Sequence, residues 1–309
     1  MKPELLYIES ARYTPESLQL LEEHFTVRHV VHYEDLATAL KNAEILVSSL
    51  QFQYSTGLLR SAQRLRFVVS NTTGINHIQL APGIDVKLIY LEDRSEIDSI
   101  TTTAELALTL ILSLIRNLRT NHELVKAGNW DRYVAPGESW RGMKVGIIGL
   151  GRLGRKVADF CTLLGMQVQY YDPYVQIKTP VKIDALENLL STSDIISVHA
   201  ILNNETWGML DYRLLSKAKR GCVLVNTARG ELIVESDLVR CLEEGIFVGA
   251  GLDVLSEEQE HGFLTNNMIA RYALNHSNVI ITPHIGGACP SSRKFTENLV
   301  IERLLRFYR

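Results

Sequence analysis

Short apolar runs alternate with helical patterns of apolar positions along the first hundred residues. The runs predict strands at residues 5–8, 26–31, 44–47, 67–70 and 88–90. The intervals at 15–25, 34–42 and 56–61 have helical spacing, and Thr14 followed by Pro15 predicts where the first helix starts. Strands that alternate with helices predict a parallel sheet covered on both faces.

A second alternating series follows a long apolar helix predicted over residues 103–119. Six apolar runs predict its strands, at residues 144–148, 167–171, 195–198, 222–225, 248–252 and 279–281. Helices are predicted between them, among them 152–164 and 235–244, the latter ended by Gly245. Six such strands make a complete dinucleotide-binding sheet of the Rossmann type. A final helix, at 291–308, lies beyond this sheet and is expected to pack against the first series.

The composition limits the classes of function. The chain has 309 residues, is 46% hydrophobic and carries a formal net charge of −3, which suits two domains with their own cores. No basic run is present, so neither nucleic acid nor an anionic membrane is an expected partner. The four cysteines are scattered without a CxxC pair, which predicts no metal site and no disulfide framework.

The sequence also predicts a cytoplasmic location. The N-terminus, MKPELLYIES, has no apolar core of signal-peptide length. The most apolar stretch, residues 104–115, contains Glu105 and is too short to span a bilayer. It predicts a buried helix instead.

A glycine-rich loop joins the strand at 144–148 to the following helix. Its sequence is Gly149-Leu-Gly151-Arg152-Leu153-Gly154. Gly149 permits a tight turn, Gly151 lets a pyrophosphate approach the backbone, and Gly154 lets the helix pack closely on the strand. The N–H groups at the helix start favour phosphate charge, so this loop predicts a dinucleotide site.

An acidic residue at the end of the next strand supports the same site. Asp172 follows the strand at 167–171, where an acid accepts hydrogen bonds from the adenosine ribose and repels a 2′-phosphate. The competing interpretation is a solvated aspartate before a turn-forming proline, Pro173. Strand, glycine loop, helix, strand and acid occur in the expected order, which favours NAD as the cofactor.

Four further short segments accompany the glycine loop in a fixed order. They are residues 103–107 (TAELA), 226–230 (NTARG), 251–254 (GLDV) and 282–287 (TPHIGG). With these segments the chain resembles the D-isomer-specific 2-hydroxyacid dehydrogenase family over nearly its whole length. The last three lie at carboxyl ends of predicted strands, where open α/β sheets bind their ligands.

The resemblance implies three catalytic residues. Arg229 would bind the substrate carboxylate and 2-oxygen through its fork of donors. His284 would be the general acid/base, since hydride transfer to an oxo acid leaves an alkoxide that needs a proton. A carboxylate beside the imidazole stabilises its charged form, and register assigns this role to Glu258, with Glu257 as the weaker alternative.

The resemblance also implies contacts with cofactor and substrate. Asp253 matches the position that contacts the nicotinamide carboxamide. The other cofactor positions predicted outside the glycine loop and Asp172 are His199, Thr227 and Ala228. In the first series, backbone amides of Thr73 and Gly74 would bind the substrate carboxylate, together with Arg229 and His284.

Several positions depart from the family pattern. Ile201 and Gln259 each stand where the family usually has proline. Ser48 and Ser49 replace a basic residue that members with phosphorylated substrates often carry, which argues against 3-phosphoglycerate. Nothing marks His77 as a second catalytic base.

The sequence therefore predicts two doubly wound parallel-sheet domains. A flavodoxin-like substrate domain, residues 1–98 and 286–309, would contain an inserted Rossmann domain, residues 99–285, with the active site in the cleft between them. Residues 106–140 are apolar in their first half and aromatic in their second, with Trp130, Tyr133 and Trp140. They predict a homodimer interface, unless the helix is buried within its own domain.

Reversible NAD(H)-dependent reduction of a small 2-oxo acid to the D-2-hydroxy acid is the predicted activity. One alternative is formate or phosphite oxidation on the same fold. For this alternative, Gln259 rather than Glu258 would be the partner of the catalytic histidine. Another is an NAD-sensing binding protein like the corepressors built on this fold, which would show ligand-dependent partner binding and negligible turnover. The sequence leaves open which 2-oxo acid is used and in which direction the reaction runs.

Overall fold

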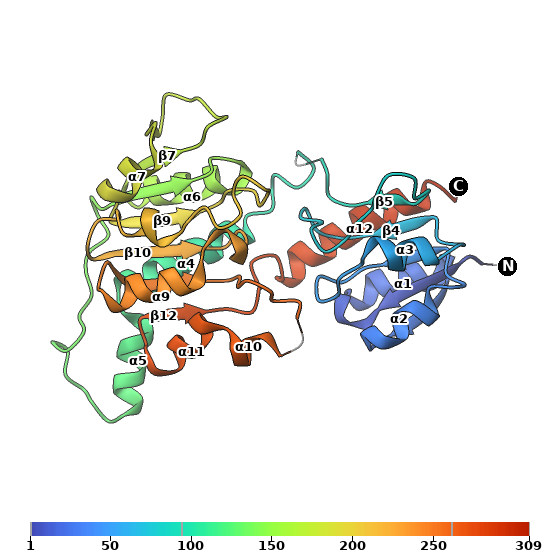
Figure 1. Ribbon diagram of the computed structural model, residues 1–309, viewed down its shortest axis with the longest axis horizontal. Helices are drawn as coiled ribbons and strands as arrows, with labels where there is room; N and C mark the ends of the chain where they lie inside the picture. The colour runs from blue at the N-terminus through green and yellow to red at the C-terminus, as the bar shows by residue number, and fades with distance from the viewer. Residues whose placement is uncertain (1, 94, 261, 309) are drawn as a thin grey trace. The chain divides into compact units, whose positions relative to one another are not determined.

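The computed structural model of this protein describes residues 2–93, 95–260 and 262–308. The chain divides into two compact units, each an α/β arrangement (Figure 1). Unit 1 consists of residues 1–100 and 288–309, and unit 2 of residues 101–287. The prediction of two parallel-sheet domains is confirmed.

The described part of unit 1 contains a five-stranded parallel sheet in the order β2-β1-β3-β4-β5, the order of flavodoxin-like sheets. The strands are β1 (Glu4–Ile8), β2 (Thr26–Val30), β3 (Ile45–Val47), β4 (Phe67–Val69) and β5 (Lys87–Ile89). The helices are α1 (Pro15–His24), α2 (Tyr33–Ala39), α3 (Thr56–Ser61), α12 (Pro290–Leu305) and the 3-10 turn η1 (Glu9–Ala11).

Alternate residues of the strands in unit 1 belong to different cores. Leu5 and Tyr7 of β1 pack with α1 and α12 on one face, and Leu6 and Ile8 pack with α2 and α3 on the other. This period of two is the property of a strand that is covered on both faces. Helix α12 contacts α1, β4 and β5, so the chain returns to its first unit as predicted.

Over the described residues of unit 2, seven parallel strands form a sheet in the order β12-β11-β10-β9-β6-β7-β8. They are β6 (Lys144–Ile148), β7 (Gln167–Tyr171), β8 (Val181–Lys182), β9 (Ile195–Val198), β10 (Cys222–Asn226), β11 (Phe247–Leu252) and β12 (Val279–Ile281). The helices are α4 (Thr102–Ile115), α5 (Leu118–Lys126), α6 (Arg152–Leu163), α7 (Leu186–Thr192), α8 (Tyr212–Leu215), α9 (Glu235–Glu243), α10 (Phe263–Asn266), α11 (Met268–Asn275) and the 3-10 turn η2 (Gly230–Leu232).

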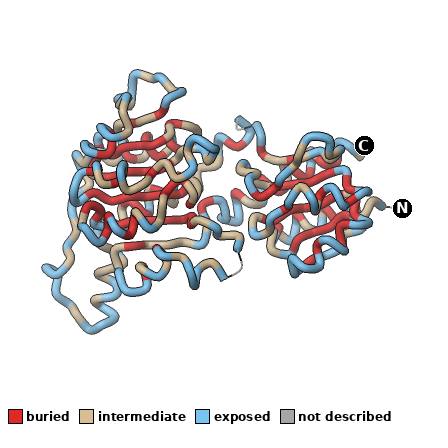
Figure 2. Tube along the Cα trace, in the orientation of Figure 1, coloured by how far each residue is buried: buried red, intermediate tan, exposed pale blue. Residues whose placement is uncertain are grey.

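Two layers of helices cover the sheet of unit 2. Helices α4 and α6 pack on one face, and α7, α8, α9 and α11 pack on the other. The central strands β6, β9, β10 and β11 are mostly buried between them (Figure 2), as expected for a parallel sheet between two helical layers. No helix in the described part of the chain has the length and apolarity needed to cross a bilayer.

The structure corrects three predicted elements. The helix predicted over 103–119 ends at Ile115, because Asn117 adopts a left-handed conformation (φ 49°) and α5 starts anew after it. The sheet of unit 2 gains β8, which pairs with β7 through only two residues and is too short to leave a periodic pattern. The terminal helix ends at Leu305, three residues before the predicted end at 308.

Candidate active site

The predicted site residues of unit 2 gather at one edge of its sheet. Strands β12, β11, β10, β9, β6 and β7 are neighbours in this order and all run parallel. Their carboxyl ends are followed, in the same order, by His284, Asp253, Arg229, His199, Gly149 and Asp172. Because β7 and β9 lie on opposite sides of β6, the glycine loop occupies the topological switch point of the sheet.

The three glycines of the loop have different physical reasons to be glycine. Gly149 has φ 90°, and a Cβ there would lie 2.7 Å from the backbone of Ala200. A Cβ at Gly154 would lie 2.1 Å from the carbonyl oxygen of Gly149, so any side chain would force α6 away from β6. A Cβ at Gly151 would meet nothing within 4 Å, which leaves open space against the backbone where a pyrophosphate is expected.

The start of α6 faces this open space. Gly151 precedes α6, and Arg152, Leu153 and Gly154 are its first three residues. The first turn of a helix has N–H groups without an acceptor inside the helix, and the helix dipole adds positive potential there. This arrangement suits the charge of a phosphate group.

Asp172 is buried and connects the glycine loop to the turn after β7. Its Oδ2 accepts a hydrogen bond from the N–H of Leu150 at 2.8 Å. Its Oδ1 accepts from the N–H groups of Tyr174 at 2.9 Å and Val175 at 3.0 Å. A carboxylate offers about four acceptor positions, so the geometry leaves one position for a ribose hydroxyl.

Two buried polar atoms at the same edge of the sheet have no hydrogen-bond partner among the described residues. They are Nδ1 of His199 and Oγ1 of Thr227. Because unsatisfied buried polar atoms are costly and uncommon, they indicate a polar ligand at this edge. Together with the space at Gly151, they make these residues fit a dinucleotide. Ala228 lies beside Thr227, and its N–H donates to the Asn226 side chain.

His199 gives the folded state a specific sensitivity to acid. Burial lowers the pKa of His199 from 6.5 to about 4. The unfolded chain therefore binds an additional proton between these values, and stability falls as the pH falls from about 6.5 towards 4. We expect a loss of roughly 2–3 kcal/mol between pH 7 and 4.5 that His199→Gln removes. Urea unfolding of both proteins at the two pH values tests this, and equal losses would contradict it.

His284 and Glu258 form a short hydrogen-bonded pair. Nδ1 of His284 lies 2.5 Å from Oε1 of Glu258, and both side chains are largely shielded from solvent. The competing acid, Glu257, has a left-handed backbone (φ 59°), and the structure directs Glu258 rather than Glu257 to the imidazole. This is the pairing that the register of the sequence predicted.

Asp253 positions the segment that carries His284. Its Oδ1 accepts from Oγ1 of Thr282 at 2.6 Å and from the N–H of Ile285 at 2.8 Å. Its Oδ2 accepts from the N–H of Gly286 at 2.8 Å, and its carbonyl accepts from the N–H of His284 at 2.9 Å. These bonds stabilise the left-handed conformation of His284 (φ 53°). The predicted contact of Asp253 with the carboxamide stays a prediction.

Asn226 positions the segment of Arg229 in the way that Asp253 positions the segment of His284. This role of Asn226 was not predicted from the sequence. Its buried side chain donates from Nδ2 to the carbonyl of Arg229 at 2.8 Å and accepts from the N–H of Ala228 at 3.0 Å. Arg229 has no ion-pair partner among the residues that the structure describes, and its Nη1 donates to the Ala228 carbonyl at 2.6 Å. Its guanidinium charge is thus available to a ligand.

Gly230 brings the segment after β10 against the segment after β11. A Cβ at Gly230 would lie 2.1 Å from the carbonyl carbon of Leu255 and 2.2 Å from the nitrogen of Ser256. Any side chain here would separate the two segments. Arg229 and Glu258 therefore come from two chain segments that are in backbone contact.

The predicted substrate loop lies in unit 1. Thr73 and Gly74 follow β4, in a turn that two side-chain hydrogen bonds stabilise. Oγ1 of Thr72 donates to the carbonyl of Gly74 at 2.9 Å and lies 2.8 Å from Oγ of Ser70. His77 is buried and its ring packs edge-on against Tyr54.

Two segments of the chain match family descriptions. Residues 108–286 match the D-isomer specific 2-hydroxyacid dehydrogenase NAD binding domain. Residues 6–82 match the D-isomer specific 2-hydroxyacid dehydrogenase catalytic domain. The first match alone covers more than half of the chain.

Individual relatives agree with these matches. The chain is 29% identical to a glyoxylate reductase of Thermococcus gammatolerans over 99% of this chain and 93% of that protein. It is 30% identical to a D-3-phosphoglycerate dehydrogenase of Pongo abelii, over 82% of this chain and 47% of that protein. A D-lactate dehydrogenase of Aquifex aeolicus, solved with NAD and lactic acid, superposes with a TM-score of 0.86 at 25% identity, over 98% of this chain and 95% of that one.

The matches cover both units and include the glycine loop, Arg229, Glu258 and His284. The site geometry and the matches lead to the same class of reaction, a hydride transfer between NAD(H) and a small acid. The chain belongs to the D-isomer specific 2-hydroxyacid dehydrogenase family and is an NAD-dependent oxidoreductase of 2-hydroxy and 2-oxo acids.

Proposed function

We propose that this enzyme reduces small 2-oxo acids with uncharged side chains, with His284 as proton donor, Glu258 as its partner and Arg229 as substrate anchor. The observation that carries this proposal is the 2.5 Å contact between His284 and Glu258. It occurs at the sheet edge that also carries Arg229 and the glycine loop. A charge-paired imidazole at such an edge is suited to proton transfer.

The proton would travel through one defined atom of His284. Bound NADH supplies the hydride to C2 of the substrate. Because Glu258 holds Nδ1, Nε2 of His284 is the nitrogen that remains to donate a proton to the 2-oxygen. The carboxylate of Glu258 stabilises the imidazolium needed for reduction, and neutral His284 accepts the hydroxyl proton in the reverse reaction.

The neutral environment of unit 1 supports the choice of substrate class. Ser48 and Ser49 are buried at the carboxyl end of β3. Ser48 bonds to the Val69 carbonyl, and the N–H of Ser49 donates to the Tyr54 hydroxyl. These serines offer no positive charge to a phosphate. The amides of Thr73 and Gly74, with Arg229, would hold the substrate carboxylate.

Asp172 is proposed to select NAD over NADP. It offers one remaining acceptor position and a negative charge at the end of β7. The charge would repel a 2′-phosphate on the ribose. His199, Thr227 and Ala228 would complete the cofactor contacts along the neighbouring strand ends.

The decisive experiment follows NADH absorbance with a panel of acids. Glyoxylate, pyruvate, hydroxypyruvate and a branched 2-oxo acid are compared with a phosphorylated 2-oxo acid, and NADPH replaces NADH in a parallel series. We expect turnover of unphosphorylated acids and at least about tenfold lower kcat/KM with NADPH. Turnover of formate with NAD⁺, or of none of the acids, would contradict the proposal.

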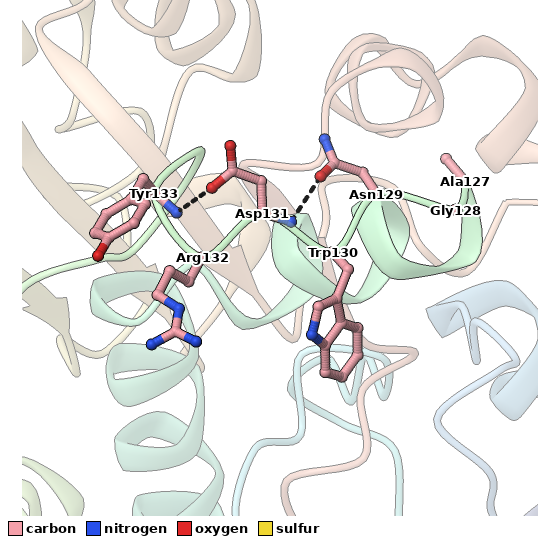
Figure 3. Close-up of a pocket in the computed structure, with 7 residues that line it drawn as sticks. All are labelled: Ala127, Gly128, Asn129, Trp130, Asp131, Arg132 and Tyr133. Carbon is pink, nitrogen blue, oxygen red and sulfur yellow. Dashed lines mark hydrogen bonds between the residues drawn. The ribbon is translucent and has the colours of Figure 1, made fainter.

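A homodimer is the second part of the proposal, and its interface is assigned to the second part of the predicted range 106–140. Helix α4 is core of its own unit, since Ala107, Leu110, Ile111 and Leu114 are buried against α6, β10 and β11. The apolar surface lies after it, on α5 and on the segment that follows, of which Figure 3 draws the side chains of residues 127–133. Its exposed residues are Leu118 (61%), Val125 (49%), Trp130 (87%), Tyr133 (81%) and Val134 (51%).

The shape of this segment favours a second copy of the chain as its partner. Asn129 and Asp131 bond to backbone N–H groups within it, while Trp130 and Arg132 project away from these two side chains (Figure 3). Its far end is bonded back to α5, where Asn121 donates to the Ala135 carbonyl at 2.6 Å. A segment that is fixed by hydrogen bonds and exposes aromatic side chains is typical of an interface between subunits.

Replacing Trp130 and Tyr133 together by serine is expected to convert the dimer to a monomer, because the aromatic anchors of the interface are lost. Sedimentation velocity at micromolar concentration measures this. The matched control replaces two exposed leucines elsewhere in unit 2, Leu163 (84%) and Leu274 (81%), by serine. A monomeric wild-type protein would overturn the dimer.

A cytoplasmic location completes the proposal. Cys161, Cys222 and Cys241 are buried free thiols, and Cys289 is an exposed free thiol. Burial raises the pKa of Cys161 and Cys222 to about 12. Four unpaired cysteines in a chain of 309 residues suit a reducing compartment.

A further inference from the structure

Glu235, the first residue of α9, lies outside the reacting groups but touches both ends of the segment that carries Glu258. Its Oε1 accepts a hydrogen bond from the N–H of Ser256 at 2.7 Å. Its Oε2 accepts from Nδ2 of Asn267 at 2.5 Å. We call the segment between these two residues the Glu258 loop.

Each contact of Glu235 lies next to a well-packed part of the chain, one just before the Glu258 loop and one just after it. Val254 and Leu255, just before Ser256, are buried, and Leu255 is pressed against Gly230. Asn267 precedes α11 and caps it, because its Oδ1 accepts from the N–H of Ala270 at 2.9 Å. Glu235 thus holds together the two ends of the Glu258 loop at its base.

The position of Glu258 depends on where this loop begins. Glu257 adopts a left-handed conformation immediately after Ser256. A hydrogen bond of 2.9 Å from the N–H of Glu260 to the carbonyl of Glu257 closes the turn around Glu258. A shift at Ser256 would therefore move the Glu258 carboxylate relative to His284, and small misplacements of a catalytic group have large effects on rate.

We propose that Glu235 is a positioning residue, which fixes the base of the Glu258 loop and so holds the Glu258 carboxylate against His284. The inference rests on the proposed function of the His284–Glu258 pair. Burial raises the pKa of Glu235, which measures the cost of placing this carboxylate away from water. The two hydrogen bonds offset part of that cost.

The test compares four variants by two measurements. Glu235→Gln keeps the shape of the side chain, but its NH2 group then faces one of the two hydrogen-bond donors, Ser256 or Asn267, so that one hydrogen bond is lost. Asn267→Asp keeps the cap of α11 and replaces the donor to Glu235 by a second carboxylate. Glu258→Gln removes the acid under study. Glu243→Gln is the charge-matched control, since Glu243 is exposed at the other end of α9 and makes no side-chain contact with the loop among the described residues.

The first measurement is the NMR signal of the ring proton that His284 shares with Glu258, recorded in the protein without substrate and assigned with a His284→Asn variant. Glu258→Gln is expected to displace this signal, because the short hydrogen bond to a carboxylate is lost. Glu235→Gln and Asn267→Asp are expected to displace it in the same direction, and adding Glu235→Gln to Glu258→Gln is expected to have no further effect, because both act through one contact. Glu243→Gln is expected to leave the signal in place.

The second measurement is steady-state reduction with NADH. Glu235→Gln and Asn267→Asp are expected to lower kcat about tenfold or more, with unchanged NADH affinity in a fluorescence titration. An unchanged His284 signal in both variants would overturn the inference. So would an equal loss of kcat, NADH affinity and melting temperature, which a purely structural role produces. If the wild type reduces no 2-oxo acid, the proposed function fails, while the NMR signal still decides the role of Glu235.

Discussion

Replacing His284 by asparagine is expected to lower kcat for the reduction of a 2-oxo acid by about a thousandfold, because the proton donor is lost. Asparagine is the suitable replacement, since His284 has a left-handed backbone (φ 53°) that asparagine adopts more readily than most residues. The loss is expected in kcat, because proton transfer belongs to the transition state rather than to binding. Stopped-flow or steady-state NADH absorbance measures it.

The controls for this experiment separate the proton transfer from the fold. NADH affinity is expected to stay at the wild-type value, because the glycine loop and Asp172 belong to other strand ends. His276→Asn replaces a histidine at the end of α11 that makes no contact with Glu258 in the described structure, and it should leave kcat unchanged. Near-normal reduction by His284→Asn across the panel would show that another group donates the proton.

Replacing Arg229 by glutamine is expected to lower kcat/KM by about a hundredfold to ten-thousandfold. The guanidinium has no carboxylate partner in the described part of the chain, and the substrate would lose two charge-assisted hydrogen bonds. Arg229→Lys keeps the charge but not the planar fork, so its kcat/KM should lie between those of the wild type and Arg229→Gln. Initial rates over a range of 2-oxo acid concentrations measure both variants.

A matched arginine elsewhere tests whether charge alone explains the loss. Arg213 has 91% of its side chain exposed, and Arg213→Gln should leave kcat/KM unchanged. NADH affinity is expected to be the same in all these proteins. A wild-type KM for the oxo acid in Arg229→Gln would mean that the substrate carboxylate is held elsewhere.

The local sequence carried most of the information about which residues belong to the site. Gly149, Gly151 and Gly154 were recognisable because each solves a steric problem within a few residues of itself. Strands were recognisable because both sheets are buried on both faces, which makes their sequences continuous apolar runs. The break at Asn117 and the short strand β8 were missed, since neither disturbs a periodic pattern.

The local sequence did not distinguish the functions of individual carboxylates. Asp172 and Asp253 were both expected to face the cofactor. The structure adds that each binds three donors within the protein, and that Asp253 thereby holds the segment of His284. Asn226 and Glu235 had no signal of their own. The bonds of Asn226 reach backbone groups two and three residues away, in a segment without a periodic pattern. Those of Glu235 reach Ser256 and Asn267, 21 and 32 residues away, which only the tertiary structure brings near.

Residue types and their order along the chain were enough to specify two parallel sheets and a phosphate loop at a strand end, while the cation, the imidazole and the acid expected for catalysis came from the family resemblance. The sheets and the loop depend on steric and periodic rules that act over short stretches of chain. Only the tertiary structure placed the carboxylate of Glu258, rather than that of Glu257, against His284 and left the apolar side chains of α5 exposed. These outcomes depend on which strands become neighbours, because a hydrogen bond of 2.5 Å between residues 26 positions apart exists only once β11 and β12 lie side by side.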